Sequence, residues 1–152
     1  FLLSHIPKGE FPVVLDLGCG DGVLGVAAKR QNPSSRLAFC DESRMAVESA
    51  RANYARRFED EARFVWTHCY QGQDAGSVDL VLCNPPFHQG HVVGEAVARQ
   101  MFADAHHALV DGGRLRVVAN KHLDYPAALR RLFGACRVVA TNRKFVILDA
   151  FR

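Results

Sequence analysis

Apolar residues along this chain follow two alternating patterns, short continuous runs and longer segments in which they recur every three or four positions. Continuous runs are typical of buried strands, and helical spacing is typical of helices that bury one face. The runs predict strands at 13–15, 37–40, 64–66, 78–83, 115–119, 137–140 and 145–148. The spaced segments predict helices that start at Val23 and that cover roughly 46–54, 93–109 and 125–133.

Residues that cap or break helices set the expected helix ends. The first helix is expected to stop around Asn32-Pro33, and the third at Asp111-Gly112-Gly113. The fourth has Asp124 as its candidate N-cap, Pro126 in its first turn and Gly134 just past its end. The apolar face of that fourth helix comprises Tyr125, Ala128, Leu129, Leu132 and Phe133.

The order of these elements predicts the fold class. Five strands separated by helices pair in parallel through right-handed crossovers, with helices on both faces. The last two strands are joined by the short polar turn 141–144 and must therefore be antiparallel. We expect an α/β fold with a seven-strand, mostly parallel sheet and a C-terminal antiparallel hairpin. Ligands of such sheets bind beyond the carboxyl ends of the strands, where the strand order reverses.

Length and composition favour one globular domain. The chain has 152 residues, 49% of them apolar and 23% charged, which suits a single core over residues 1–152. It contains no apolar run near the ~20 residues that a membrane helix needs, so no membrane partner is expected. The net charge of +3 permits a polyanionic partner without requiring one. Because the chain starts at Phe1 rather than Met, we expect it to be part of a longer protein.

The five cysteines form no CxxC pair and are scattered along the chain. We expect small buried hydrophobes in a reducing cytoplasm rather than disulfides or metal ligands. His88 and His91 are spaced like a metal pair, but no third ligand lies near them, so we interpret them as hydrogen-bonding residues at the edge of the sheet and expect no metal.

A glycine-rich loop follows the first strand, with the sequence Asp-Leu-Gly-Cys-Gly-Asp-Gly at 16–22. Glycines allow a tight turn and a close approach of the backbone to a ligand. A dinucleotide fingerprint needs glycine three positions after Gly20, where this chain has Val23, and no Walker Gly-Lys-Ser/Thr is present. Asp41, at the tip of the second strand, can accept both hydroxyls of a ribose, and Glu42 is the competing candidate.

The segment Asn84-Pro85-Pro86-Phe87 directly follows the fourth strand. The two prolines end the hydrogen-bond ladder and set the direction of the loop. The Asn84 amide oxygen and the Pro85 carbonyl can accept the two N–H groups of an aryl amine, and they stabilise the positive charge that develops on its nitrogen during methyl transfer. Phe87 can stack on the base. The segment therefore predicts methylation of a planar, conjugated amine.

The glycine loop and the strand-end Asp41 together resemble the S-adenosylmethionine-dependent methyltransferases, whose Rossmann-like sheet has seven strands. The resemblance implies that the loop Gly18–Gly22, with Cys19 and Gly20, wraps the methionine end of the cofactor. It also implies that Asp16 orients the cofactor's amino group and that Asp41 or Glu42 holds its ribose. The adenine would lie at His68-Cys69, where family members carry Asn or Asp at the first position and the Cys69 amide is the alternative contact.

Longer motifs resemble the bacterial ribosomal RNA guanine-N2 methyltransferases of the large-subunit type. These motifs are Asn-Pro-Pro-Phe-His-Gln-Gly-His at 84–91, Val-Ala-Asn-Lys-His-Leu-Asp-Tyr at 118–125 and Thr-Asn-Arg-Lys-Phe at 141–145. The resemblance implies a cytoplasmic enzyme whose substrate is ribosomal RNA, preceded in the family by a cofactor-free domain that assists RNA binding. The residues expected to contact substrate are Pro86, His88, Asn120, Lys121, Arg143 and Lys144. Contacts with RNA phosphates are expected from Lys121, His122, Arg143 and Lys144.

Other functions remain open at this stage. Similar Asn-Pro-Pro motifs serve methyltransferases that act on adenine amino groups or on protein glutamine. From other classes, a nicotinamide-dependent oxidoreductase and a non-catalytic RNA-binding module are the alternatives.

Overall fold

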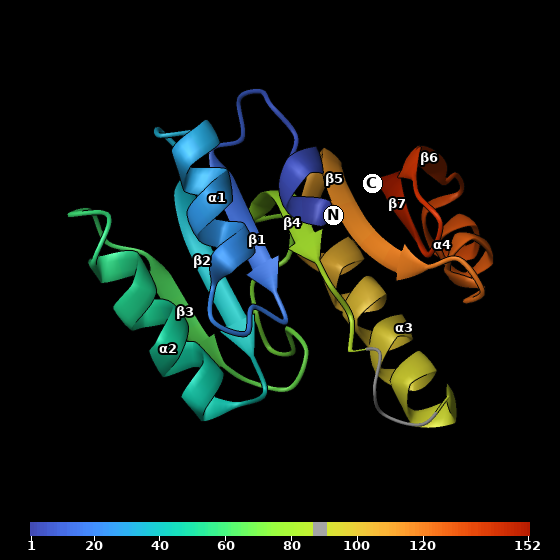
Figure 1. Ribbon diagram of the computed structural model, residues 1–152, viewed down its shortest axis with the longest axis horizontal. Coiled ribbons are helices and arrows are strands. Elements are labelled where there is room, and N and C mark those ends of the chain that lie inside the picture. Colours follow the sequence, from blue (N-terminus) through green and yellow to red (C-terminus); the bar gives the residue numbers. More distant parts are fainter. Residues whose placement is uncertain (87–90) are drawn as a thin grey trace.

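The computed structural model describes residues 1–86 and 91–152 of the chain. Figure 1 shows a central sheet with helices packed against it. The helical elements are η1 (Leu2–His5), α1 (Val23–Gln31), α2 (Arg44–Ala55), α3 (His91–Ala108) and α4 (Tyr125–Phe133). The strands are β1 (Val13–Leu17), β2 (Arg36–Asp41), β3 (Arg63–Trp66), β4 (Val78–Cys83), β5 (Leu109–Asn120), β6 (Arg137–Thr141) and β7 (Phe145–Phe151).

The seven strands form one sheet in the order β3-β2-β1-β4-β5-β7-β6. Strands β1 to β5 pair in parallel, and β7 pairs antiparallel with both β5 and β6. The α/β class, the parallel pairing and the C-terminal hairpin are therefore as predicted. The strand order reverses between β1 and β4, which are neighbours in the sheet, so the carboxyl ends of β1, β2 and β4 lie at the edge where a ligand is expected.

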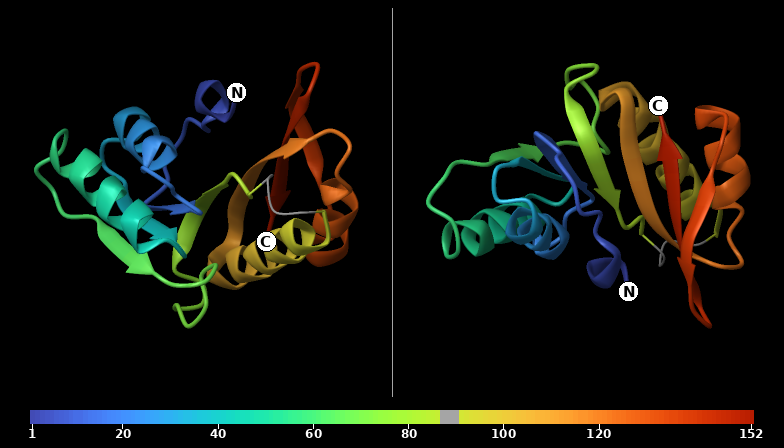
Figure 2. Two further views of the ribbon diagram at one scale, coloured as in Figure 1. Left: turned by 60° about the horizontal axis from the view of Figure 1, so that its bottom comes forward. Right: turned by 90° about the horizontal axis from the view of Figure 1, so that it is seen from above.

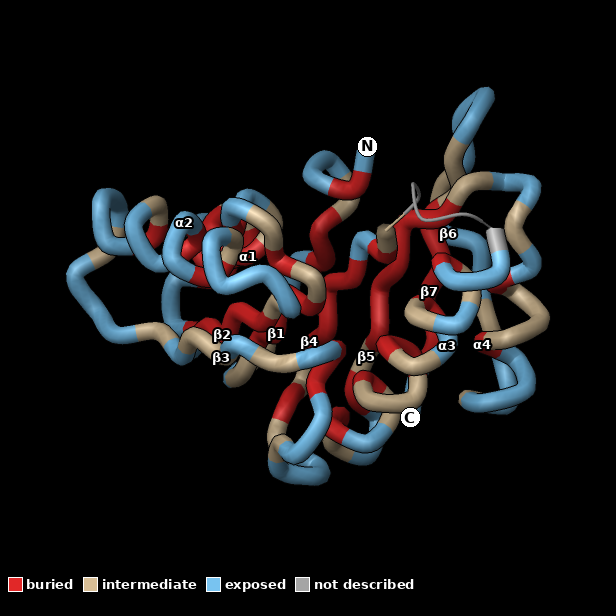
Figure 3. Tube along the Cα trace, turned by 90° about the horizontal axis from the view of Figure 1, so that it is seen from below, coloured by how far each residue is buried: buried red, intermediate tan, exposed pale blue. Residues whose placement is uncertain are grey.

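Alternation along the strands divides the core between the two faces of the sheet. Val14, Phe39 and Leu82 pack with α1 and α2, while Leu15 and Cys40 pack with α3 and α4 on the opposite face. Figure 2 shows the two pairs of helices on opposite sides of the sheet, and Figure 3 shows the buried residues concentrated along its central strands. Among the described residues, no helix combines the length and apolar character needed to cross a bilayer.

The predicted end of the third helix is wrong. Helix α3 ends at Ala108, and Leu109 belongs to β5, where it pairs with Val78. The Gly112-Gly113 pair does not stop a helix but lies inside β5, where the chain bulges out against β4. Gly112 has φ +78°, and its amide donates to the carbonyl of Arg152, so the glycines let β5 continue past the bulge.

Smaller differences concern β1 and α4. The strand β1 includes Asp16, which was expected to start the loop. Asp124 occupies the N-cap position of α4, but its side chain makes no capping hydrogen bond. On the predicted apolar face of α4, Tyr125 and Leu129 are buried, whereas Leu132 is 37% exposed. Gly134 ends the helix with φ +83°, as expected of a C-terminal glycine.

Candidate functional site

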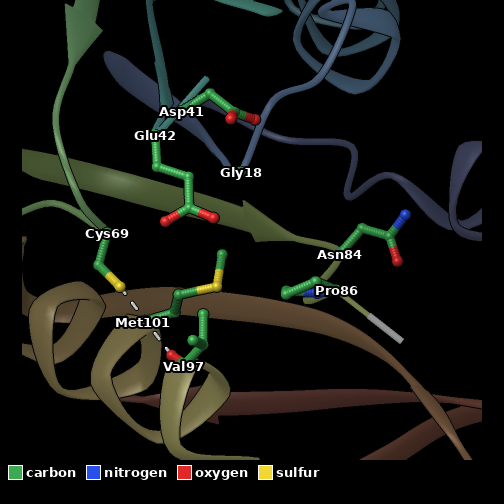
Figure 4. Close-up of a pocket in the computed structure, with 8 residues that line it drawn as sticks. All are labelled: Gly18, Asp41, Glu42, Cys69, Asn84, Pro86, Val97 and Met101. Carbon is green, nitrogen blue, oxygen red and sulfur yellow. Dashed lines mark hydrogen bonds between the residues drawn. The ribbon is translucent and has the colours of Figure 1, made fainter. Parts of the chain in front are cut away.

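A cavity of about 140 Å³ lies at the carboxyl ends of β1, β2 and β4. Figure 4 shows the side chains that surround it. Gly18, Asp41 and Asn84, three residues predicted for the site from separate strands, all line this first cavity. Glu42, Cys69 and Pro86 line it as well. The topology therefore brings together the glycine loop, the acidic end of β2 and the Asn-Pro-Pro segment.

The glycine loop is bound to the end of β2 through its backbone amides. The N–H groups of Gly18 and Cys19 donate to the carbonyl of Cys40, at 2.8 and 2.9 Å. The N–H of Gly20 donates to Oδ2 of Asp41 at 3.0 Å. Gly18 and Gly20 have φ +71° and +53°, which lets the loop turn back onto β2. These three amides are thus satisfied by the protein itself.

Carboxylates also bind the amides at the start of α1. The N–H of Gly25 donates to Oδ2 of Asp16 at 2.8 Å, and that of Val23 donates to Oδ1 of Asp21 at 3.4 Å. A dinucleotide pyrophosphate needs free amides at this helix terminus. Because carboxylates already bind these amides, the geometry disfavours a nicotinamide dinucleotide and favours a ligand with positive charge.

Asp16 is fully buried beneath α1 and does not line the first cavity. Burial, opposed by the Gly25 hydrogen bond and reinforced by Asp21 and Asp41, raises the pKa of the Asp16 carboxyl to about 7. Within the described residues, its Oδ1 atom has no hydrogen-bond partner. The structure thus gives Asp16 a role in holding α1, and its predicted contact with a cofactor stays a prediction.

Gly22 also packs against a neighbour and does not line the first cavity. It has φ +81°, and a Cβ there would lie 2.9 Å from the Cβ of Ala50. Glycine at position 22 is therefore required for the close packing of α1 against α2. The predicted contact of Gly22 with a cofactor stays a prediction.

The two acids at the end of β2 have different surroundings. Both oxygens of Asp41 accept backbone hydrogen bonds, Oδ2 from Gly20 and Oδ1 from Ser43 at 2.8 Å. Glu42 instead points into the first cavity (Figure 4), and its Oε2 lies 3.0 Å from Nδ1 of His68. His68 is exposed and lies outside the lining of the cavity, so in this structure it contacts Glu42.

Cys69 forms the wall of the first cavity next to α3. It adopts a left-handed backbone, φ +48°, and its carbonyl accepts a hydrogen bond from Sγ of Cys40 at 2.6 Å. The neighbouring amide of Tyr70 donates to Asp104 of α3 at 2.9 Å. Burial raises the pKa of the Cys69 thiol to about 11, so the thiol stays protonated at neutral pH. All five cysteines of the chain are free thiols in the structure.

Asn84 stands exposed at the end of β4, directly before the buried Pro85. Within the described residues, its side-chain amide makes no hydrogen bond, so it is available to a ligand. Phe87 and His88, predicted to stack on the base and to contact substrate, lie outside the described residues.

A second cavity, of about 500 Å³, meets the first at Gly18 and Asn84. Cys19, Gly20 and Asp21 of the glycine loop line it on one side. Its remaining wall is largely apolar and was not predicted from the sequence. These further lining residues are Phe1, Leu2, Leu3, Val23, Leu24, Val118 and Phe145.

Two residues of α3 that line the first cavity were also missed. Val97 and Met101 follow the helical spacing of core residues, and that spacing alone predicted burial. Met101 reaches the glycine loop, since its Cε lies 2.8 Å from where a Cβ on Gly18 would be. The one available signal was the position of this helix directly after the Asn-Pro-Pro segment.

The basic residues predicted to contact RNA gather at the tip of the β6–β7 hairpin and the end of β5. The amide of Lys121 donates to the carbonyl of Lys144 at 3.1 Å, and its Nζ donates to the carbonyl of Asn142 at 3.2 Å. Nζ of Lys144 lies 5.4 Å from the centre of the Phe145 ring, at one end of the second cavity. Arg143 is exposed, and Asn120 is half-buried at the end of β5.

Within residues 1–86 and 91–152, no three His, Cys, Asp or Glu side chains are grouped as metal ligands.

Comparison with known proteins identifies the family of this chain. The family model of the methyltransferase small domain matches residues 1–149. The chain is 49% identical to the ribosomal RNA large subunit methyltransferase G of Shewanella amazonensis, over 99% of the chain and 40% of that protein. It is 46% identical to the protein of the same name from Psychromonas ingrahamii, over 100% of the chain and 41% of that protein. The chain thus spans less than half the length of these relatives.

Solved structures agree on the fold. The 16S rRNA N2 G1207 methyltransferase of T. thermophilus, determined with AdoMet and guanosine, superposes with a TM-score of 0.78 at 23% identity, over 99% of this chain and 40% of that one. The ribosomal protein L11 methylase of Lactobacillus delbrueckii gives a TM-score of 0.75 at 15% identity, over 99% of this chain and 74% of that one.

Proposed function

Because this chain belongs to the methyltransferase small domain family, we propose that it transfers a methyl group from S-adenosylmethionine to the exocyclic N2 of a guanine in large-subunit ribosomal RNA. One observation carries the proposal: the first cavity, which contains Asp41 and Glu42, and the larger second cavity meet at Gly18 and Asn84. Two reactants can therefore approach the same exposed amide from different sides. The names of the relatives support ribosomal RNA of the large subunit as the substrate.

The residues of the first cavity fit S-adenosylmethionine. This cofactor supplies a methyl group activated by a positively charged sulfonium. Glu42 and Asp41 would face its ribose hydroxyls, and Cys69, Val97 and Met101 would pack against its adenine. Its methionine end would pass Gly18 and lie against Cys19 and Gly20, where the first cavity opens into the second. An acidic site with few free amides favours this cationic, hydroxylated molecule over a polyphosphate.

Asn84 performs the chemistry on the acceptor side. Its amide oxygen accepts a hydrogen bond from the guanine amine, and the Pro85 carbonyl accepts the second N–H. Positive charge develops on the amine nitrogen as it becomes tetrahedral, and both dipoles stabilise that charge. The nitrogen gains the methyl group as the carbon–sulfur bond of the donor breaks, and it afterwards releases one proton to solvent. Because the amine is positioned rather than deprotonated before transfer, the site needs no general base at that step. The target guanine must be unpaired or turned out of its stack to reach Asn84.

The decisive test replaces Asn84. We expect Asn84→Ala to lower kcat by about 10²–10³-fold or more, because a preorganised acceptor is lost. The cofactor dissociation constant should stay within a few-fold of the wild-type value, since the first cavity keeps its acids. Asn84→Asp, which keeps an acceptor oxygen, should retain more activity than the alanine variant. Turnover of Asn84→Ala near the wild-type rate would contradict the mechanism.

The identity of the product separates the remaining alternatives. Nucleoside analysis of methylated RNA should find N2-methylguanosine. N6-methyladenosine, or methylated glutamine in a protein substrate, would assign the chain to a different acceptor. RNA binding without methyl transfer would favour the non-catalytic module.

We also propose that residues 1–152 form the C-terminal catalytic domain of a two-domain cytoplasmic protein, whose preceding domain assists RNA recognition. The length of the relatives, of which this chain spans 40%, supports this arrangement. The five free cysteines are typical of a reducing compartment.

A further inference from the structure

The second cavity continues away from Asn84 into a third cavity, of about 420 Å³, between α1 and α2. We call this third cavity the lateral groove. The two share Leu3, Asp21 and Val23 in their linings, so together they form one continuous depression. Asn84 lines the second cavity, and Arg30 and Arg57 line the lateral groove.

The lining of this depression changes character along its length. Where the two cavities meet, Leu3 and Val23 are 45% and 46% exposed, and the exposed acid Asp21 lies beside them. At its far end lie two exposed arginines, Arg30 in the last turn of α1 and Arg57 just past α2. Asp21 is the one acid among the residues that line the lateral groove. Exposed apolar side chains followed by paired cations are typical of a surface that binds a nucleotide chain.

Arg57 is linked to the glycine loop through two hydrogen bonds. Its Nη1 donates to the carbonyl of Asn53 at 3.0 Å. Nδ2 of Asn53 in turn donates to the carbonyl of Asp21 at 2.9 Å. The guanidinium is therefore held at a defined place relative to the site, rather than extended freely into solvent.

The opposite end of the second cavity is also basic. There the lining passes from Asn84 to Val118 and Phe145, next to Lys144 and Lys121 at the hairpin tip. Cations thus line the lateral groove and lie next to Phe145 of the second cavity, which Asn84 also lines. A strand whose target base is turned toward Asn84 needs contacts for its backbone on both sides of that base.

We propose that the RNA strand carrying the target guanine crosses the site along this depression, and that Arg30 and Arg57 bind its backbone phosphates in the lateral groove. The inference rests on the proposed function and extends it by naming the path of the flanking nucleotides. The hairpin cations hold one side of the target nucleotide, and the two arginines hold the other.

The test measures binding of a single-stranded 12-nucleotide RNA with one central guanine to the full-length protein over a range of salt concentrations. Arg30→Ala/Arg57→Ala should weaken binding ~10-fold at moderate salt and lower the slope of log K against log salt by ~0.7 per lost phosphate contact. Arg30→Lys/Arg57→Lys keeps both charges and should preserve most of the slope. The affinity for S-adenosylmethionine should be the same in all variants.

The matched control is Arg44→Ala/Arg56→Ala, which removes the same charge from exposed positions on α2 and its end that line none of these cavities. It should leave RNA binding within about twofold, because net charge alone contributes little at moderate salt. Equal losses in the two alanine pairs, or none in Arg30→Ala/Arg57→Ala, would overturn the proposal.

Two further outcomes are distinguishable. If Arg30→Ala/Arg57→Ala changes self-association and leaves RNA binding unchanged, the lateral groove is a contact between protein chains. This result would overturn the proposal. An RNA affinity that depends on Arg30 and Arg57, without formation of N2-methylguanosine by the wild type, would support the path of the strand and reject the proposed function.

Discussion

At the scale of single residues, the complete burial of Asp16 disfavours ionisation of its carboxyl group. Its carboxyl lies under α1 with one hydrogen bond from Gly25, and its pKa is raised to about 7. In the unfolded chain the same group has a pKa near 3.8. Protonation therefore favours the folded state: the stabilising contribution is complete below pH ~4 and is lost as the pH rises through ~7.

We expect Asp16→Asn to remove this pH dependence. Relative to the wild type, the variant should gain stability between pH 5 and pH 8 by ~2.6 kcal/mol, because about two of the pH units between the two pKa values lie within this window. Urea denaturation of both proteins at the two pH values, without ligand, measures the difference. A difference between the two proteins that is the same at pH 5 and pH 8 would show that Asp16 does not titrate with a raised pKa.

At the scale of elements, the packing of α1 onto the sheet requires glycine at position 25. A Cβ on Gly25 would lie 2.2 Å from Cε1 of Phe39 and 2.7 Å from its Cζ. Phe39 is fully buried and stacks on Phe64, with ring centres 5.1 Å apart, so it cannot move aside without disturbing β3. Because Gly25 has no side chain, the backbone of α1 packs directly against Phe39 of β2. This close packing brings the glycine loop, which precedes α1, to the end of β2.

Gly25→Ala should therefore destabilise the fold by ~1–3 kcal/mol or more, through overpacking. Phe39→Leu in the same chain makes room for the methyl group, so the double variant should be more stable than the sum of the two single changes predicts. Urea midpoints of the four proteins give the coupling free energy. If the losses in free energy of unfolding are additive, the strain of Gly25→Ala does not come from contact with Phe39.

At the scale of the whole molecule, one buried carboxylate joins the N-terminal segment to the C-terminal hairpin. Asp149 of β7 is fully buried, and its oxygens accept hydrogen bonds from Arg116 of β5 at 2.6 and 2.7 Å and from Arg137 of β6 at 3.2 Å. Arg116 also donates to the carbonyl of His5, so three strands and the N-terminal turn meet at this group. We expect the placement of β5 and β7, which carry Val118 and Phe145, to depend on this carboxylate.

Asp149→Ala leaves Arg116 buried without its counter-ion, which typically costs ~3–5 kcal/mol. We expect a loss of this size in chemical denaturation. Asp111→Ala is the matched control, because Asp111 is fully exposed and lies 3.9 Å from Arg152, so its removal should change stability by less than ~1 kcal/mol. Similar losses for the two variants would contradict a structural role for the buried group.

The sequence by itself determined the features that depend on near neighbours. Apolar runs and helical spacing located the strands and helices, and residues that follow strands placed Gly18, Asp41 and Asn84 at one edge of the sheet. The prediction failed at Asp111-Gly112-Gly113, because a local turn signal cannot reveal that Leu109 pairs with Val78 in a neighbouring strand.

Only the tertiary structure decided which residues distant in the chain come together. It placed β7 between β5 and β6, bound Asp41 to the glycine loop while Glu42 points into the first cavity, and brought Val97 and Met101 of α3 to that cavity. It also joined the cavity that Asn84 lines to the one that Arg30 and Arg57 line, through Leu3, Asp21 and Val23. The physical reason is that periodicity records which face of an element is buried, whereas the partner buried against that face is set by packing across the whole fold.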